Sequence, residues 1–459
     1  MSRVVIVGGG ITGLAAAWEL QQQGVEYTLL ESADRLGGKI KTDRVDGFVI
    51  EGAADSFLTQ KPAAWQLCRE IGLADRLIGT NDERRNVYVY KDGKLQLFPG
   101  GMRLIVPLDP AGLLQSDLLS ESGKRRMLAE PDIPPRTDTA DESLAAFVER
   151  RFGAEALEVF GESLLAGIHV ADPQKLSIAA AFPNYVKYER TYGSVIRGMQ
   201  SAAPAAPNPD APKTAFVSLR GGMIELIEGL AARLTGDIRT GQAITRIASD
   251  RTVYTSTGEK FKPDAIILTT PAQPASKMLS QAAPELSAAL AALTTVSSGT
   301  VSLGFRAAEI DHPLNGFGFV IPRSEPTRIL AGTWSSSKLA YRAPEGYVLI
   351  RVFIGGHGRE ADVELPDDQL VALARSELQK IMGITAEPVI SRVFRWRNAN
   401  PQYTVGHLDR VAHFNALSPA WLFLAGCTYD GVGIPDCVRQ GRQIAGYTAQ
   451  HVIAPENIS

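Results

Sequence analysis

The sequence predicts an α/β fold joined to an α+β part, and three observations carry this prediction. A buried-type strand at 4–7 leads through a glycine-rich turn into an amphipathic helix and a further strand. A strand, a glycine-rich loop and a helix follow one another again at 421–453. Between them, helical spacing dominates 141–197 and strand-like runs dominate 296–354. The chain therefore combines a strand–helix–strand unit with a mixed sheet and a helical segment.

The composition is that of a globular protein with more than one domain. Its 459 residues favour two or three domains, and 45% of them are hydrophobic and 21% charged. The net charge of −3 gives no reason to expect a nucleic-acid partner. No apolar run approaches the roughly 20 residues of a spanning helix, and the first strand leaves no room for a signal peptide. We therefore expect a cytoplasmic protein, and we leave open a peripheral membrane contact and a homodimer.

Cysteine and histidine usage points away from disulfides and metals. The three cysteines, Cys68, Cys427 and Cys437, are odd in number and widely spaced, which favours reduced thiols. The six histidines form no His-x-x-His pair, and the cysteines form no Cys-x-x-Cys pair. We expect neither a disulfide framework nor a metal site.

The N-terminal unit has the layout of a Rossmann-like βαβ motif. Apolar residues run at helical spacing through 14–20, Gly24 ends the helix, and 27–30 form the next strand. The turn at 8–13 holds the pattern Gly-x-Gly-x-x-Gly. Its glycines permit a tight turn, close approach of a pyrophosphate and close packing of helix on strand. Free N–H groups at the helix N-terminus favour the phosphate charge.

Glu31 closes the second strand, where a carboxylate that binds an adenosine ribose is expected. The glycine pattern alone is weak evidence, because most glycine turns are only turns. Together with this acid it indicates a dinucleotide site. An acid at this place disfavours NADP, whose ribose carries a phosphate, and leaves both FAD and NAD open.

Two further segments favour FAD over NAD. The run from Arg35 through Gly37-Gly38-Lys39 to Thr42 resembles the Arg-x-Gly-Gly-(Arg/Lys)-x-x-Thr segment of glutathione-reductase-like flavoproteins of the amine-oxidase type. In those proteins the doubled glycine lies against the FAD pyrophosphate. The loop 426–434 stands between a strand and a helix, and resembling flavoproteins hold the flavin end of the cofactor there. An NAD dehydrogenase has no need of such a loop, so we expect FAD.

Three more segments resemble the porphyrinogen oxidases of haem biosynthesis. They are 394–407, with a Pro-Gln-Tyr-x-x-Gly-His stretch after Trp396, and the segments 167–183 and 429–437. The layout is most similar to the bacterial subgroup that acts on coproporphyrinogen III. The chain departs from the family pattern at Ala53-Ala54, at His169 and Ala171, and at Tyr192-Gly193-Ser194. The last two changes bear on the substrate pocket.

The resemblance and the motifs together give a set of predicted site residues. Propionate groups need Arg or Lys near an apolar pocket, which makes Arg85, Arg190 and Arg197 candidates for binding substrate, although each also suits a solvated surface. The residues expected to bind FAD are Gly8, Gly9, Gly10, Ile11, Thr12, Gly13, Glu31, Ser32, Gly37, Gly38, Lys39, Ala53, Ala54, Asp55, Ser56, Ile244, Trp396, Gly426, Val432, Gly433 and Ile434.

We expect three domains, two of them discontinuous. The Rossmann-like FAD-binding domain is predicted from 1–58, 213–280 and 392–459. A mixed-sheet substrate-binding domain is predicted from 59–100 and 281–391. A helical subdomain, 101–212, ends in a Pro/Ala-rich stretch at 201–212 that we expect to be an exposed loop.

The resemblance implies the FAD-dependent oxidation of coproporphyrinogen III to coproporphyrin III, with protoporphyrinogen IX left open as a second substrate. The reaction removes six electrons, so a two-electron flavin acts three times, with O2 reduced to H2O2. We expect hydride transfer from a bridge carbon to the flavin, and no catalytic side chain, because the cofactor carries the chemistry. An amine oxidase, a carotenoid desaturase and a non-catalytic flavin-binding protein stay open as alternatives on the same scaffold.

Overall fold

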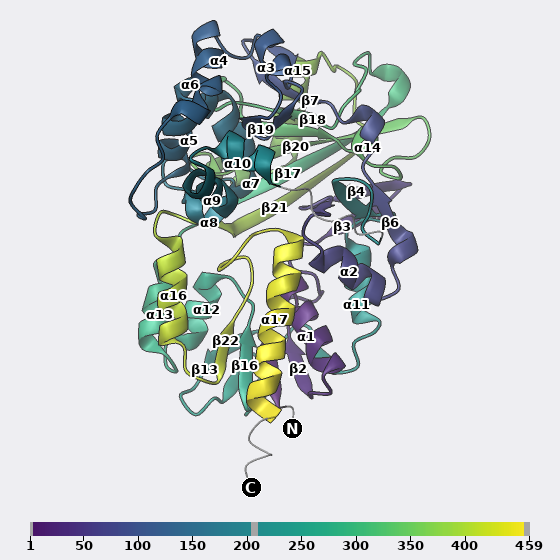
Figure 1. Cartoon of the computed structure of the whole chain (residues 1–459). Helices are drawn as coiled ribbons and strands as arrows, with labels where there is room; N and C mark the ends of the chain where they lie inside the picture. The colour runs from purple at the N-terminus through teal and green to yellow at the C-terminus, as the bar shows by residue number, and fades with distance from the viewer. Residues whose placement is uncertain (1–2, 203–209, 454–459) are drawn as a thin grey trace.

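The computed structural model describes residues 3–202 and 210–453, which form two bodies (Figure 1). The lower body in Figure 1 holds a parallel sheet with helices on both faces, and the upper body holds a larger sheet flanked by helices. The mixed α/β class predicted from the sequence is therefore confirmed. Residues 203–209 of the predicted Pro/Ala-rich loop lie outside the described residues.

The parallel sheet of the lower body brings together strands from both ends of the chain. The central β1 (Val4–Val7) pairs with two neighbours, so that Val4 lies opposite both Tyr27 and Ala265. These three strands are buried along their whole length, as expected of a parallel sheet covered on both faces. The strand order is β12 (Asp237–Arg239), β2 (Tyr27–Leu30), β1, β16 (Ala265–Leu268) and β22 (Leu422–Leu424).

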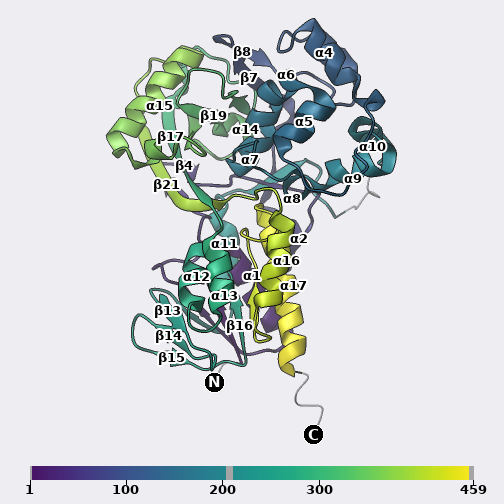
Figure 2. The ribbon, with the colours of Figure 1, turned by 90° about the vertical axis from the view of Figure 1, so that its left-hand side faces the viewer.

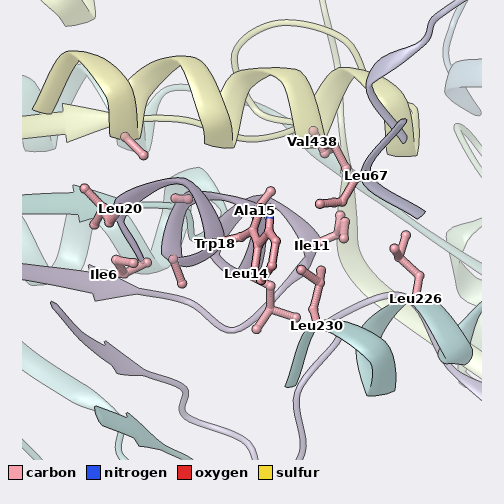
Figure 3. Close-up of a cluster of buried hydrophobic side chains, with 14 of the residues drawn as sticks. Ile6, Ile11, Leu14, Ala15, Trp18, Leu20, Leu67, Leu226, Leu230 and Val438 are labelled. Atoms are coloured by element: carbon pink, nitrogen blue, oxygen red, sulfur yellow. The ribbon is translucent and has the colours of Figure 1, made fainter. Parts of the chain in front are cut away.

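One face of this sheet packs against α1 (Ile11–Gln22) and α17 (Ile434–Ile453), which lie side by side (Figure 3). Most of α1 is buried, because it lies between the sheet, α17 and α11 (Ile224–Ala231). The two long helices meet at a glycine: a Cβ on Gly441 would lie 2.3 Å from the backbone oxygen of Thr12. At Gly441 the backbone of α17 therefore packs directly against the backbone of α1, with no side chain between them.

The other face of the sheet packs against α12 (Ala272–Leu279), α13 (Pro284–Ala291) and α16 (His407–Leu417). Alternate residues of β1 serve the two faces: Val4 and Ile6 belong to the α1 cluster, and Val5 and Val7 belong to the α12 cluster. Figure 2 shows a small antiparallel sheet beside α12 and α13. Its strands are β13 (Ile244–Ile247), β14 (Val253–Thr255) and β15 (Lys260–Phe261).

The upper body is built on a seven-stranded sheet. Val301, Ile350 and Val352 on one of its faces pack against α15 (Asp367–Met382). The alternate residues Thr300 and Arg351 point to the opposite face, which looks toward the cavity described below. All neighbouring strands are antiparallel except β18 and β7. The order is β21 (Ile390–Pro401), β17 (Thr295–Arg306), β20 (Tyr347–Gly355), β19 (Ile329–Trp334), β18 (Gly318–Val320), β7 (Val87–Lys91) and β8 (Lys94–Leu97).

A group of short helices covers one side of the upper body (Figure 2). They pack around Phe147, Phe152 and Phe160. The fully buried Arg151 pairs with Glu130, which offsets the cost of burying either charge. The helices are α3 (Pro110–Gln115), α4 (Glu121–Leu128), α5 (Leu144–Phe152), α6 (Ala154–Ala156), the π-helical segment Leu157–Ala166, α7 (Gly167–His169), α8 (Ile178–Ala181), α9 (Pro183–Tyr192) and α10 (Val195–Ser201).

The predicted domain boundaries stay a prediction, and two elements lie across them. β21 is hydrogen-bonded to β17 in the seven-stranded sheet, although the boundary at 392 assigns it to the FAD domain. α13 packs on the parallel sheet, although the boundary at 281 assigns it to the substrate domain. The remaining short elements are β3 (Thr42–Val45), β4 (Phe48–Glu51), β5 (Phe57–Leu58), α2 (Ala63–Glu70), β6 (Leu77–Gly79), β9 (Met102–Arg103), β10 (Val106–Pro107), β11 (Phe216–Leu219) and α14 (Ser335–Lys338).

Candidate functional site

A cavity of about 980 Å³ lies where the two bodies meet. Part of its wall comes from loops of the lower body, at the ends of β1, β2 and β16. The rest comes from the face of the seven-stranded sheet opposite α15 and from the segment 162–171 beside it. A single cavity therefore joins the glycine loops to a second chamber with walls of mainly apolar side chains.

The glycine loop after β1 offers backbone N–H groups to this cavity. Gly10 is the N-cap of α1 and no side chain caps the helix there. A Cβ on Gly10 would meet nothing within 4 Å, so this position faces open space. Gly8 has φ +110°, and a Cβ on Gly8 would lie 2.7 Å from Oγ1 of Thr269, so a side chain is excluded there. An uncapped helix N-terminus facing a cavity is suited to an anion such as a pyrophosphate.

Glu31 lies at the end of β2, and its carboxylate is held by the backbone. The N–H of Gly9 donates to Glu31 Oε2 at 2.6 Å, and the N–H of Ala33 donates to Oε1 at 2.8 Å. Glu31 is half-buried and lines the cavity. Ser32 Oγ also donates to Oε1 at 3.2 Å, so Oε2 is the oxygen that keeps capacity to accept a hydrogen bond from a ribose hydroxyl.

The Gly37-Gly38 turn packs directly on the first glycine loop. The N–H of Gly37 donates to the carbonyl of Gly9 at 2.8 Å, and a Cβ on Gly38 would lie 3.3 Å from Cα of Gly10. Both glycines have positive φ, at +105° and +56°. Arg35 braces the turn by donating to the carbonyls of Gly38 and Ile40. The two glycine segments thus form one continuous part of the cavity wall.

A buried ionic cluster holds the next loop, 52–56, against the upper body. Lys338 Nζ lies 2.8 Å from Asp55 Oδ1, and Arg351 Nη2 lies 2.9 Å from Asp55 Oδ2. Arg351 also donates to the carbonyl of Ala53 at 2.6 Å. Burial alone would raise the pKa of Asp55, but Lys338 and Arg351 outweigh it and hold this pKa well below its usual range. The aspartate is therefore ionised and fixes the loop.

The C-terminal loop closes the site from the other end of the chain. Trp396 in β21 donates its indole N–H to the carbonyl of Gly52 at 2.8 Å and lines the cavity. Tyr403 donates its hydroxyl to the carbonyl of Cys427 at 2.6 Å. The N–H of Gly426 donates to Oε1 of Gln440 on α17 at 3.0 Å. The last two bonds hold the loop between β22 and α17 in place, and the Trp396 bond ties β21 to the loop 52–56.

Most of the residues predicted to bind FAD line this one cavity, although they come from distant parts of the sequence. Gly9, Gly426 and Gly433 lie in the same loops and Gly13 lies in the first turn of α1, but none of the four is part of the wall. Ile244 packs against the cluster around α12 instead. The residues that line the cavity are Gly8, Gly10, Ile11, Thr12, Glu31, Ser32, Gly37, Gly38, Lys39, Ala53, Ala54, Asp55, Ser56, Trp396, Val432 and Ile434.

The three arginines proposed for the substrate do not reach the cavity. Arg85, Arg190 and Arg197 are exposed, and none is part of the wall. Nη2 of Arg190 donates to the carbonyl oxygen of Thr139 at 3.4 Å. Nη2 of Arg197 lies 3.8 Å from Oδ1 of Asp132. All three side chains are solvated surface cations, so the presence of an arginine near a motif in the sequence did not identify a residue of the cavity wall.

Sequence reasoning also missed basic residues that do line the cavity, namely Arg323, Lys338 and Arg351. Arg351 interrupts an otherwise apolar strand at 348–354, and a charge at such a position was the one signal that could have found it. Lys338 ends the short helix α14 and Arg323 stands in the connection between β18 and β19, and neither belongs to a sequence motif. Within residues 3–202 and 210–453, no His, Cys, Asp or Glu side chains gather in a group of three that could hold a metal ion.

The family model described as flavin-containing amine oxidoreductase matches residues 11–448. The chain belongs to this family. Membership confirms the predicted flavin cofactor and the predicted oxidoreductase class. The residues of this amine oxidoreductase family member also fit a flavin dinucleotide: an uncapped helix faces the cavity at Gly10, and the same cavity reaches from Glu31 to Val432.

Relatives of this flavin-containing amine oxidoreductase match it over nearly its whole length. Coproporphyrinogen III oxidase of Bacillus subtilis (strain 168) is 35% identical and the match covers 96% of each chain. Coproporphyrinogen III oxidase of Staphylococcus aureus (strain NCTC 8325 / PS 47) is 33% identical, with 98% of this chain and 99% of the relative covered. A crystal structure from Exiguobacterium sp. 255-15, assigned as a protoporphyrinogen oxidase, superposes with a TM-score of 0.85 at 33% identity, covering 98% and 99%.

Proposed function

We propose that this chain is an FAD-dependent porphyrinogen oxidase that converts coproporphyrinogen III to coproporphyrin III. The observation that carries the proposal is the single cavity of about 980 Å³, which joins the glycine loops to a chamber of mainly apolar walls. The glycine loops that line one side of the cavity suit a dinucleotide, and the apolar side chains that line the other side suit the hydrocarbon body of a macrocycle. The names of the full-length relatives support the same substrate.

In this proposal the N-terminus of α1 and the Gly37-Gly38 turn hold the pyrophosphate, because both offer backbone rather than side chains. Glu31 accepts hydrogen bonds from the adenosine ribose. Trp396 and the loop residues Val432 and Ile434 surround the flavin end. The bound flavin supplies the two-electron oxidation, and a porphyrinogen needs three such rounds.

The chain's own residues then position the macrocycle and exclude water. Phe353 and Leu330 present apolar surface to the cavity from two strands of the upper sheet. The buried Asp55–Arg351 pair keeps the wall rigid between the two parts of the cavity. We assign no acid or base to a side chain, because aromatisation of the product provides the driving force.

We further propose O2 as the electron acceptor, with H2O2 as its product. Peroxide formed during turnover, measured with a coupled peroxidase, should match the porphyrin formed in a ratio of three to one. A homodimer and a peripheral membrane contact stay predictions, which light scattering and vesicle co-sedimentation would test. In the part of the chain that the structure describes, no helix is long and apolar enough to cross a membrane.

The decisive experiment measures porphyrin fluorescence when flavin-loaded protein is mixed with coproporphyrinogen III or with protoporphyrinogen IX. The proposal expects coproporphyrin to form well above the spontaneous rate, and anaerobic mixing to bleach the flavin. A flavin that stays oxidised with both porphyrinogens but bleaches with an amine would instead favour an amine oxidase. If no substrate bleaches it, the protein binds flavin without this activity.

A further inference from the structure

Arg323 lines the cavity on the side of the seven-stranded sheet, next to the segment 162–171. It follows β18 by three residues and lines the cavity beside Ile321. Its Nη2 donates to the carbonyl of Ala171 at 3.2 Å, and its backbone N–H bonds to the carboxylate of Glu162. The guanidinium is thus held in place by the segment 162–171, which forms the facing wall.

The guanidinium of Arg323 forms no salt bridge with the described residues, although Glu162 lies near enough to interact with its charge. Among the described residues no carboxylate oxygen is paired with its guanidinium within 4 Å, in contrast to Lys338 and Arg351, which share Asp55. The fourth basic residue of the wall, Lys39, donates to the carbonyl of Ala399 at 2.9 Å and lies in the glycine segment of the lower body. Arg323 is therefore the cation of the substrate chamber that retains most of its capacity to bind an anion.

Arg323 is half-buried, and several of its neighbours on the cavity wall are apolar. Ile168, Val170 and Leu330 line the same chamber with apolar side chains. A guanidinium in such a place presents a planar fork of donors that matches a carboxylate in a bidentate geometry. A ligand with an apolar body and a carboxylate at its edge combines the two features of this chamber.

We propose that Arg323 binds a side-chain carboxylate of the porphyrinogen and so fixes the orientation of the macrocycle in the cavity. This inference rests on the function proposed above and adds to it the residue that recognises the charged rim of the substrate. It replaces Arg85, Arg190 and Arg197, which lie outside the cavity.

Glu162 lies on the same wall and opposes this attraction when it is ionised. Burial raises the pKa of Glu162, Arg323 acts to lower it, and the nearby Glu158 and Asp172 raise it further. Protonation of Glu162 would leave the positive field of Arg323 available to the substrate. Removing the charge of Glu162 should therefore strengthen the binding of a substrate carboxylate, whereas removing the charge of Arg323 should weaken it.

The test compares Arg323→Gln with Arg328→Gln, which removes an arginine in the connection before β19 whose exposed side chain pairs with Asp362. For coproporphyrinogen III, we expect KM to rise at least about tenfold in Arg323→Gln with kcat little changed. Arg328→Gln should behave like the wild type. Coproporphyrin III should also bind more weakly to Arg323→Gln, as measured by quenching of its fluorescence without turnover.

The tetramethyl ester of coproporphyrinogen III separates charge recognition from a damaged pocket. It keeps the macrocycle and lacks the charges, so Arg323→Gln and the wild type should oxidise it with the same KM. Arg323→Lys keeps the charge and should recover part of the affinity for the free acid. In Glu162→Gln, KM for the acid should fall or stay unchanged.

Three results would overturn the role of Arg323: an unchanged KM for the acid in Arg323→Gln, an equal rise for the acid and the ester, or a comparable rise in Glu162→Gln. Failure of the proposed function looks different, because the wild-type protein itself would then form no porphyrin from either compound. If Arg323→Gln does not fold, Arg323→Lys and Glu162→Gln still carry the comparison.

Discussion

The carboxylate of Asp55 lies 2.9 Å from Nη2 of Arg351, which joins the loop after β4 to the central part of the seven-stranded sheet. Both side chains are buried and both line the cavity. Arg351 uses its other terminal nitrogen to hold the carbonyl of Ala53, so the pair fixes the loop at two points. One buried contact therefore couples the stability of the fold to the shape of the wall around the cofactor site.

Replacing Asp55 with Asn should destabilise the protein strongly. The change leaves Lys338 and Arg351 without their shared counter-ion, and breaking a buried ion pair costs about 3–5 kcal/mol. Urea unfolding of the flavin-free protein measures the effect. Asp138→Asn, which breaks an exposed pair with Arg136, should leave the unfolding midpoint where it is. Equal effects of the two substitutions would contradict a special role of the buried pair.

Replacing Glu31 with Ala should weaken flavin binding about 10- to 100-fold, because a charged hydrogen-bond acceptor for the ribose is lost together with the anchor of the Gly9 N–H. The dissociation constant comes from titrating flavin-free protein with FAD and following flavin fluorescence. Glu26→Ala changes an exposed acid before the same strand and should bind FAD like the wild type. An FMN titration should show no difference among the three proteins.

Two glycines of α17 should respond to alanine in opposite directions. A Cβ on Gly441 would lie 2.3 Å from the backbone oxygen of Thr12, so Gly441→Ala should push α17 from α1 and cost roughly 1–3 kcal/mol. A Cβ on Gly446 would meet only the end of the Gln23 side chain at 3.4 Å. Gly446→Ala should therefore gain about 0.5–1 kcal/mol from helix propensity. Thermal unfolding distinguishes them, and a loss in both would argue against the contact as the cause.

Acidification should destabilise the protein through His169. Burial, with smaller contributions from Lys61 and His407, lowers the pKa of His169 to about 4, against about 6.5 in the unfolded chain. Below about pH 6.5 the imidazole of His169 binds a proton in the unfolded state but stays neutral in the folded state until the pH approaches 4. The free energy of unfolding should then fall by roughly 3 kcal/mol between pH 6.5 and pH 4.

The control for His169 is a comparison of slopes. In His169→Phe, the decrease in the free energy of unfolding over this pH range should be smaller by that amount, whatever the stability at neutral pH. His413→Gln removes an exposed histidine and should leave the slope unchanged. Parallel curves for the wild type and His169→Phe would show that another group is responsible.

Local patterns were sufficient to predict the dinucleotide half of the site. The Gly8–Gly13 turn and Glu31 belong to one short strand–helix–strand unit, so their spacing along the chain fixes their positions in space. The C-terminal loop was found through its resemblance to flavoproteins, and the structure places it beside the N-terminal loops because β22 and β1 both pair with β16.

The other half of the cavity could not be derived in the same way. Arg351, Lys338 and Asp55 meet only because separate strands and loops fold together, and no spacing rule connects residues 296 positions apart. Arg190 and Arg197 lie near motif segments in the sequence but on the outer surface of their helices. Ile244 is an apolar residue of a small strand, and its side chain serves the core around α12.

The strand order of the parallel sheet has a consequence for how the protein folds during its synthesis on the ribosome. β22 and α17 are synthesised after the strands and helices that they pack against, yet β22 is an edge of the sheet and α17 covers the helix that faces the cavity. A nascent chain therefore exposes α1 and its glycine turn until α17 has emerged from the ribosome. We expect FAD to bind only after that point, and a chain that stops before β22 should be an empty, aggregation-prone fragment.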